Sequence, residues 1–223
     1  MMDQPILFKS KYLIQEQILS LIGNAGTDFY LTGGAALSHI YLNHRFCDTL
    51  EYAVNDSHQY GVWVDKIIQK LSESIDGPLK VIRNESRVTR ITISQPQFDI
   101  VLLLVNDLPC RTGQPRQHPV YGKVDVAENI LCNRIIDLVK HRDSNHLADL
   151  WGLCCRMGIS LAEAVNSEEG KSAGIFPLDL ARVLCLASRN DWNAVDWIDP
   201  PPLQDFLAPL HDLGECLIFI NKS

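Results

Sequence analysis

The hydrophobic pattern of this chain of 223 residues changes character near Val126, and this change constrains the fold more than any other feature of the sequence. Before it, short apolar runs typical of strands alternate with helical patterns. After it, apolar residues recur at helical spacing only, as in the stripe of Ile130, Leu131, Ile135 and Leu138. We therefore predict an α+β fold in which a mixed sheet with helices (1–123) is followed by a helical bundle domain (124–223).

The first part contains the pattern of a mixed sheet. Helices are predicted at 11–22 and 62–71, and strands at 50–54, 79–82, 88–93 and 98–105. A further short strand and helix are predicted on either side of the glycine pair Gly33–Gly34. Residues 106–123 are rich in proline and glycine, which predicts a long linker loop between the two parts.

Composition excludes several classes of protein. Hydrophobic residues make up 46% and charged residues 21% of the chain, which is typical of a globular protein and not of a disordered one. The net charge of −7 argues against non-specific binding of duplex nucleic acid. Seven cysteines without a CxxC pair predict reduced thiols and a cytoplasmic location. The sequence shows no export signal and no run of eighteen apolar residues, so we expect no membrane association.

The glycine pair Gly33–Gly34 is the first candidate for chemistry. Between a strand and a helix, two glycines let the backbone approach a ligand closely, and the N–H groups of the next helical turn favour a phosphate. The alternative is a tight connection without a ligand. The turn alone does not decide between these two interpretations.

Acidic residues form the second candidate. Asp48 and Glu51 follow the glycines by about one helix length, and Asp99 lies within the apolar run 98–105. A carboxylate buried in such a strand needs a partner or a cation, and Mg²⁺ binds through one or two protein carboxylates together with phosphate oxygens and water. If the two strands are neighbours, Glu51 and Asp99 could share one cation. Alternatively, Glu51 faces solvent and Asp99 pairs with an arginine from positions 83, 87 and 90.

The run FYLTGGAALSHIYLNHRFCDTLEY over residues 29–52 resembles the nucleotidyltransferase-like toxins of bacterial abortive-infection systems (AbiEii type), within the polymerase-beta-like nucleotidyltransferase superfamily. That family shows a Gly-Gly-Thr-Ala-Leu turn, a His-Arg pair and Ser-x-Asp-Leu-Asp-Phe, followed by a third Asp on a strand. A helix with Glu-x-x-x-x-x-Lys and an Arg-Asp-x-x-Asp-Leu segment come later. Glu128 to Arg134 and residues 145–150 occupy these places here, and the resemblance covers about residues 10–155.

The resemblance implies a site that uses Mg²⁺ and a nucleoside triphosphate. It assigns the metal to Asp48, Glu51 and Asp99, with Asp48 only as a stand-in ligand. It assigns nucleotide binding to Gly33, Gly34, Arg45 and Asp149, and it makes Glu51, Asp99 and Arg134 the catalytic residues. For Arg45, a structural ion pair with Asp48 or Glu51 is the alternative.

Departures from the family pattern bear on activity. Thr49 stands where the family has the first Asp of its pair, and Glu51 stands where it has the second. Arg134 replaces the lysine, which keeps the positive charge but not its point-like form. We therefore predict transfer of a nucleotide to an RNA or protein hydroxyl, weakened by the loss of a carboxylate at Thr49. The alternative, which Thr49 favours, is a non-catalytic pseudoenzyme that binds a nucleotide or a partner protein. The resemblance also implies an antitoxin-like partner.

Overall fold

The structure is a computed structural model that describes residues 4–84, 87–107, 111–166 and 177–220. The chain divides into two compact units. The first comprises residues 1–36, 47–110 and 114–125, and the second comprises 37–46, 111–113 and 126–223. The main division thus lies at residues 125 and 126, and the segment 37–46 belongs with the C-terminal helices rather than with the sheet that precedes it in sequence.

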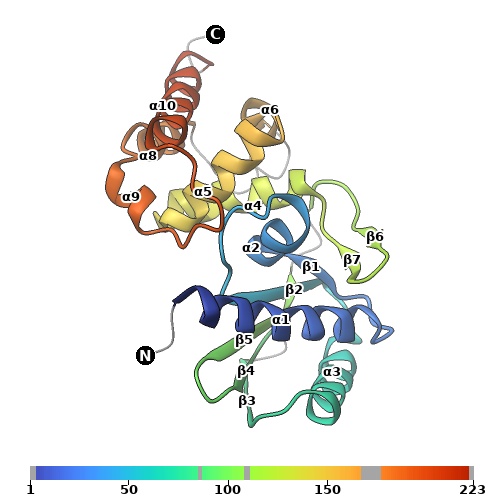
Figure 1. Ribbon diagram of the computed structural model, residues 1–223. Helices are drawn as coiled ribbons and strands as arrows, with labels where there is room; N and C mark the ends of the chain where they lie inside the picture. Colours follow the sequence, from blue (N-terminus) through green and yellow to red (C-terminus); the bar gives the residue numbers. More distant parts are fainter. Residues whose placement is uncertain (1–3, 85–86, 108–110, 167–176, 221–223) are drawn as a thin grey trace. The chain divides into compact units, whose positions relative to one another are not determined.

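A seven-stranded mixed sheet forms the centre of the first unit, in the order β3-β4-β5-β2-β1-β7-β6 (Figure 1). Its strands are β1 (Tyr30–Thr32), β2 (Thr49–Asn55), β3 (Leu79–Asn84), β4 (Val88–Ser94), β5 (Asp99–Asp107), β6 (Arg116–His118) and β7 (Gly122–Val124). β2 runs parallel to β5 and antiparallel to β1, and β1 runs parallel to β7. The strands predicted from sequence therefore belong to one mixed sheet, and the predicted α+β fold class is confirmed.

Two helices cover one face of this sheet. β5 alternates buried and less buried residues along its length, as expected of a strand with one covered face. The hydroxyl of Tyr52, on the covered face, donates to the backbone carbonyl of Leu19 in α1 (Gln4–Gly23). Tyr60, in α3 (Tyr60–Ser74), donates to the carbonyl of Leu104 at 2.9 Å. Figure 1 shows α1 lying across the strands.

The predicted linker 106–123 is not a plain loop. It contains β6 and most of β7, an antiparallel pair in which Gln117 lies opposite Lys123. β7 in turn pairs with β1, with Leu31 opposite Val124. Strands of three residues carry too little periodicity to be recognised locally, and this pair is held by a partner more than ninety positions earlier in the chain.

Helices build the second unit. Among its described residues these are α4 (Ala127–Lys140), α5 (Ser144–Trp151), α6 (Leu161–Asn166), α8 (Pro177–Cys185), α9 (Arg189–Asn193) and α10 (Leu203–Ile220), with the π-helical segments η1 (Leu37–Tyr41) and η2 (Gly152–Arg156). Edge-to-face contacts join Trp151, Trp197 and Phe206, whose ring centroids lie 5.5–6.0 Å apart. The predicted helical C-terminal part is confirmed.

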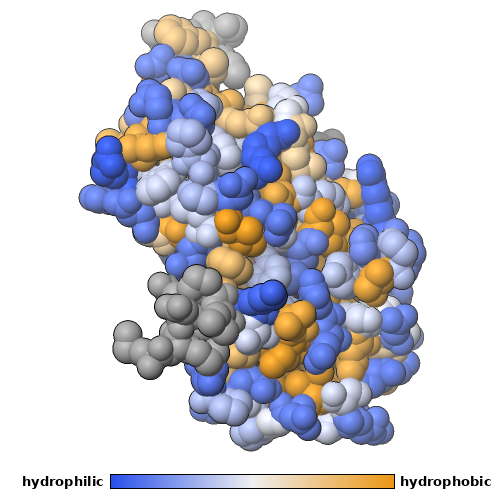
Figure 2. All heavy atoms as spheres, in the orientation of Figure 1, coloured by the Kyte–Doolittle hydropathy of each residue, from blue (hydrophilic) through white to orange (hydrophobic). Residues whose placement is uncertain are grey.

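Some large hydrophobic side chains are exposed, among them Val62, Leu186 and Phe219. On the face seen in Figure 2, hydrophobic residues lie between hydrophilic ones. Among the described residues, no helix is both long enough and apolar enough to cross a membrane.

Candidate nucleotide-binding site and the Asp149 network

The Gly33–Gly34 turn connects β1 to a short helix. β1 ends at Thr32, and α2 (Gly33–Ala36) begins at once with Gly33 at φ +63°. This left-handed conformation costs a glycine little and a residue with a Cβ considerably more. All four residues of α2 are small and buried, and α2 packs on β2. The sequence Gly-Gly-Ala-Ala is thus what lets the chain turn from strand to helix without a connecting loop.

Glu51 lies beside this turn. It is the register partner of Thr32 across the β1–β2 pair, so both side chains stand on the same face of the sheet, the one opposite α1 and α3. On the other side of Thr32 lies Asp125, whose carboxylate is fully buried and accepts a hydrogen bond from the Thr32 hydroxyl at 2.7 Å. Sequence reasoning missed Asp125. The signal that could have found it is its position at the end of β7, a strand that was taken for part of a linker.

Asp99 stands farther away along the same face. It is the first residue of β5 and is exposed, so the expectation of a carboxylate buried within an apolar strand is wrong. In the parallel β2–β5 pair, Thr49 lies opposite Val101 and Glu51 opposite Leu103. At about 3.3 Å a residue, Asp99 is roughly 7 Å along the strand from the level of Thr49 and roughly 13 Å from the level of Glu51. Thr49 therefore occupies the middle position between the two carboxylates.

Asp48 is engaged elsewhere. Its carboxylate forms an ion pair with Lys11 in α1, on the covered side of the sheet. Successive strand residues point to opposite faces, which agrees with Thr49 pointing away from Asp48. In the described parts of the chain, no group of three or more His, Cys, Asp or Glu residues could hold a metal ion. The three carboxylates that the resemblance assigned to Mg²⁺ do not fit a shared cation.

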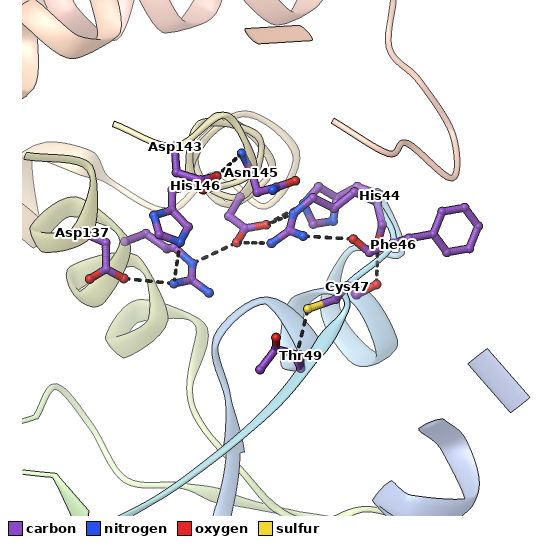
Figure 3. A network of polar contacts seen from close by, with 12 residues as sticks. His44, Phe46, Cys47, Thr49, Asp137, Asp143, Asn145 and His146 are labelled. Atoms are coloured by element: carbon purple, nitrogen blue, oxygen red, sulfur yellow. Dashed lines mark hydrogen bonds and ion pairs between the residues drawn. The ribbon is translucent and has the colours of Figure 1, made fainter. Parts of the chain in front are cut away.

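Three further predicted site residues meet in the second unit, around Asp149. Asp149 lies in α5, is fully buried, and accepts hydrogen bonds at both carboxylate oxygens. Figure 3 shows the polar contacts of this region, with His44 and His146 labelled. Arg45 binds it as a fork, with Nε 2.7 Å from Oδ1 and Nη2 2.8 Å from Oδ2. Nε of Arg134, in α4, donates to Oδ2 at 2.9 Å. Two guanidinium groups beside one buried carboxylate hold the pKa of Asp149 well below its usual range, against the opposing effect of burial.

Two histidines complete this cluster, which we call the Asp149 network. His44 is fully buried, and its Nε2 lies 3.0 Å from Oδ1 of Asp149, so Nε2 carries the proton and donates it. His146 lies with Nε2 3.4 Å from Nη1 of Arg134. Because arginine only donates, this Nε2 accepts. Burial lowers the pKa of both histidines, which are therefore neutral at pH 7.

The network explains the motifs that the resemblance singled out. Arg45 pairs with Asp149, a partner that was not considered from sequence. The side chain of Arg134 is 8% exposed, and its guanidinium contacts Asp149, Asp137 and His146. A carboxylate saturated by charged donors cannot serve as a general base. Within its own unit, this arrangement joins α4, α5 and the segment 37–46 into one structure.

Comparisons with known proteins agree with the fold. No family model and no curated protein matches the sequence. Among solved structures, the JHP933 protein from Helicobacter pylori is similar with a TM-score of 0.55 and 14% identity, over 100% of this chain and 95% of that one. MenT4, a nucleotidyltransferase toxin from Mycobacterium tuberculosis H37Rv, is similar with a TM-score of 0.57 and 15% identity, over 95% of this chain and 84% of that one. At these identities the likeness shows the fold alone, which is nucleotidyltransferase-like.

Proposed function

We propose that this chain binds a nucleoside triphosphate at the Gly33–Gly34 turn and does not transfer the nucleotide. One observation carries the second half of the proposal. Thr49 occupies the position between Glu51 and Asp99, where a carboxylate would connect the two. The side chains opposite it and Glu51 on β5 are Val101 and Leu103, which offer no oxygen.

Nucleotide binding is supported by the turn and by the fold. Gly33, in a left-handed conformation, and the small residues that follow it place the first backbone N–H groups of a helix directly after β1. Such groups suit a phosphate. MenT4, which shares the fold over most of this chain, is described as a nucleotidyltransferase toxin, and a nucleotide is the ligand that such a protein requires.

Absence of transfer follows from charge. Phosphoryl and nucleotidyl transfer depend on stabilising charge that develops on phosphate oxygens and on the attacking hydroxyl. Of the residues assigned to this task, Asp48 is bound by Lys11 and Asp99 stands apart from Glu51. Of these three, only Glu51 lies beside the glycine turn, and the nearby Asp125 is fully buried and accepts a hydrogen bond from the Thr32 hydroxyl. A single carboxylate is not sufficient to hold the pair of metal ions that such transfer reactions use.

Restoring the missing carboxylate tests this proposal. Wild type and Thr49→Asp are incubated with each of the four radiolabelled nucleoside triphosphates, Mg²⁺ and total RNA or protein, and binding is measured in parallel by equilibrium dialysis. We expect wild type to bind a triphosphate without labelling any acceptor. Thr49→Asp should gain labelling of at least tenfold over background, because it places two acids two residues apart on one strand face.

Two matched variants serve as controls. Thr49→Asn has nearly the same shape as Thr49→Asp without its charge and should label nothing. Asp99→Asn in the Thr49→Asp background should remove the gained labelling. Wild type that labels as strongly as Thr49→Asp would contradict the absence of transfer, and wild type that binds no triphosphate would contradict the nucleotide site.

Active transfer to an RNA or protein hydroxyl remains the second candidate, and its support is the preserved position of Glu51 beside the turn. The acceptor and an antitoxin-like partner stay predictions from the resemblance. Growth arrest on expression of wild type, absent for Glu51→Gln, would favour this candidate.

A further inference from the structure

A pocket lies at the opposite end of the sheet from the glycine turn. It has a volume of about 410 Å³ and is lined by residues of the first unit, among them His58, Tyr60, Gly61, Arg83, Arg87 and Asn106. Thr49 starts β2 at the glycine end, and Asn55 ends it just before this pocket. Six residue steps at about 3.3 Å place the two ends roughly 20 Å apart. The pocket, which we call the α3 pocket, is therefore distinct from the candidate nucleotide site.

Two arginines give the α3 pocket its charge. Arg83 comes from the end of β3, and Arg87 from the segment just before β4. Their side chains are about half exposed, at 48% and 52%, so the guanidinium groups can reach a ligand from solvent. Asp56 also lines the pocket, but its carboxylate lies 3.7 Å from Nη2 of Arg87, which is beyond hydrogen-bonding distance. The lining thus contains two arginines and one carboxylate, and Asp65, the partner of Arg83, lies outside it.

Arginine donors remain suited to a further anion. Nη2 of Arg83 donates to the carboxylate of Asp65, which lies outside the pocket lining. A guanidinium carries five N–H donors in a rigid fork that matches the oxygens of a phosphate. If a phosphate replaced Asp56 as the partner of Arg87, an ion pair without a hydrogen bond would give way to an ion pair with two hydrogen bonds.

The first turn of α3 adds backbone donors. Tyr60 and Gly61 line the pocket at the start of this helix of 15 residues, and the preceding Gln59 makes no side-chain cap. A Cβ added to Gly61, which lines the pocket, would meet nothing within 4 Å, so the space beside this residue is open. The N–H of Tyr60 donates to the carbonyl of Ser57 at 3.3 Å, so the donor beside the pocket is the amide of Gly61. It lies in a first helical turn, where amide groups lack partners within the helix and carry partial positive charge.

The pocket is held in shape without a ligand. The side chain of Asn106 accepts from the backbone N–H of Ser57 at 2.8 Å and donates to its carbonyl at 3.1 Å. The hydroxyl of Tyr60 is fixed between Thr89 and Leu104, with both contacts at 2.9 Å. Because these bonds fix the loop and the helix start, little ordering is needed when an anion binds.

We propose that the α3 pocket binds the phosphate group of a small phosphorylated ligand, with Arg83 and Arg87 as the anion-binding side chains and the first turn of α3 as a source of N–H donors. The volume lies within the range of small-molecule sites and accommodates more than a bare phosphate ion. The lining side chains are mostly polar, so the phosphate and not an apolar group dominates recognition.

The test titrates the full chain with inorganic phosphate and with adenosine monophosphate, by isothermal calorimetry at constant ionic strength. We expect both probes to bind wild type. Arg83→Gln/Arg87→Gln should weaken binding at least tenfold. The matched control Arg90→Gln/Arg116→Gln removes the same charge from exposed positions outside the pocket and should leave affinity unchanged.

A second variant separates the pocket from general charge. Gly61→Leu fills the open space at the start of α3 without changing charge, and leucine favours a helix more than glycine does. It should also weaken binding of both probes at least tenfold. Circular dichroism establishes that each variant is folded. Equal affinity of wild type and the pocket variants would overturn the proposal, as would equal loss in the control, or no binding to wild type at about 10 mM ligand, where even a dissociation constant of ~1 mM gives near saturation.

Discussion

Replacing Asp149 by asparagine removes one negative charge from between two buried guanidinium groups. Arg45 and Arg134 are only 5% and 6% exposed, so neither can regain hydration without local unfolding. The amide also places N–H donors where the carboxylate accepted them, facing at least one arginine donor. Removing one partner of a buried ion pair costs about 3–5 kcal/mol, against a total stability of about 5–15 kcal/mol for a folded domain.

Urea unfolding followed by tryptophan fluorescence measures this loss. Three of the four tryptophans lie in the second unit, and Trp63→Phe as the background makes the signal report on that unit alone. With a slope of about 2–3 kcal/mol per molar urea, we expect the midpoint to fall by roughly 1–2 M. Asp137→Asn is the matched control. Asp137 contacts the same Arg134 but its side chain is 41% exposed, so its loss should cost less than about 1 kcal/mol.

The pH dependence gives a second readout. Because the pKa of Asp149 is lowered in the folded state, its stabilising contribution is fully present above the unfolded pKa near 4. It is lost as the pH falls below that value toward the folded pKa. Wild type and Asp149→Asn should therefore converge in stability below about pH 4. A loss at pH 7 no larger than that of Asp137→Asn would refute the account of Asp149 as the centre of the network.

Two further predictions concern single residues. Burial lowers the pKa of His39 to about 4, so between about pH 6.5 and pH 4 this histidine is protonated in the unfolded state and neutral in the folded state. Lowering the pH from 7 to 5 therefore destabilises the folded state, and His39→Gln should reduce this loss of stability by about 2 kcal/mol in urea titrations. An unchanged pH profile would contradict this. A Cβ on Gly23 would lie 2.4 Å from the backbone carbon of Tyr121, so Gly23→Ala should cost about 1–3 kcal/mol. Gly61→Ala, which meets no atom, should cost nothing in the same measurement, and equal midpoints for the two variants would count against the tight contact.

Local pattern was sufficient to predict the main elements. Amphipathic or apolar runs of six or more residues, such as α3, β4 and β5, carry their own periodicity, and the structure contains them within a few residues of the predicted bounds. The pair β6–β7 was missed because three-residue strands depend on β1 for their existence. The exposure of Asp99 was missed because its place at the first residue of β5 depends on where that strand begins.

The candidate site was predictable in part. The sequence pattern predicted that Glu51 lies near the Gly33–Gly34 turn, and in the structure Glu51 is beside that turn. The partners of Arg45 and Arg134 were not predictable, because Asp149 lies 104 residues after the first and one helix after the second. The sequence shows that a residue is an arginine, but it does not show with which of the 27 acidic residues that arginine pairs.

A crystal structure with a non-hydrolysable nucleoside triphosphate tests the central claim most directly. The account predicts triphosphate density against the backbone of Gly33 and Gly34, with no metal ion bridged between Glu51 and Asp99. Absence of triphosphate from the Gly33–Gly34 turn, or a metal ion held jointly by Glu51 and Asp99, would contradict it.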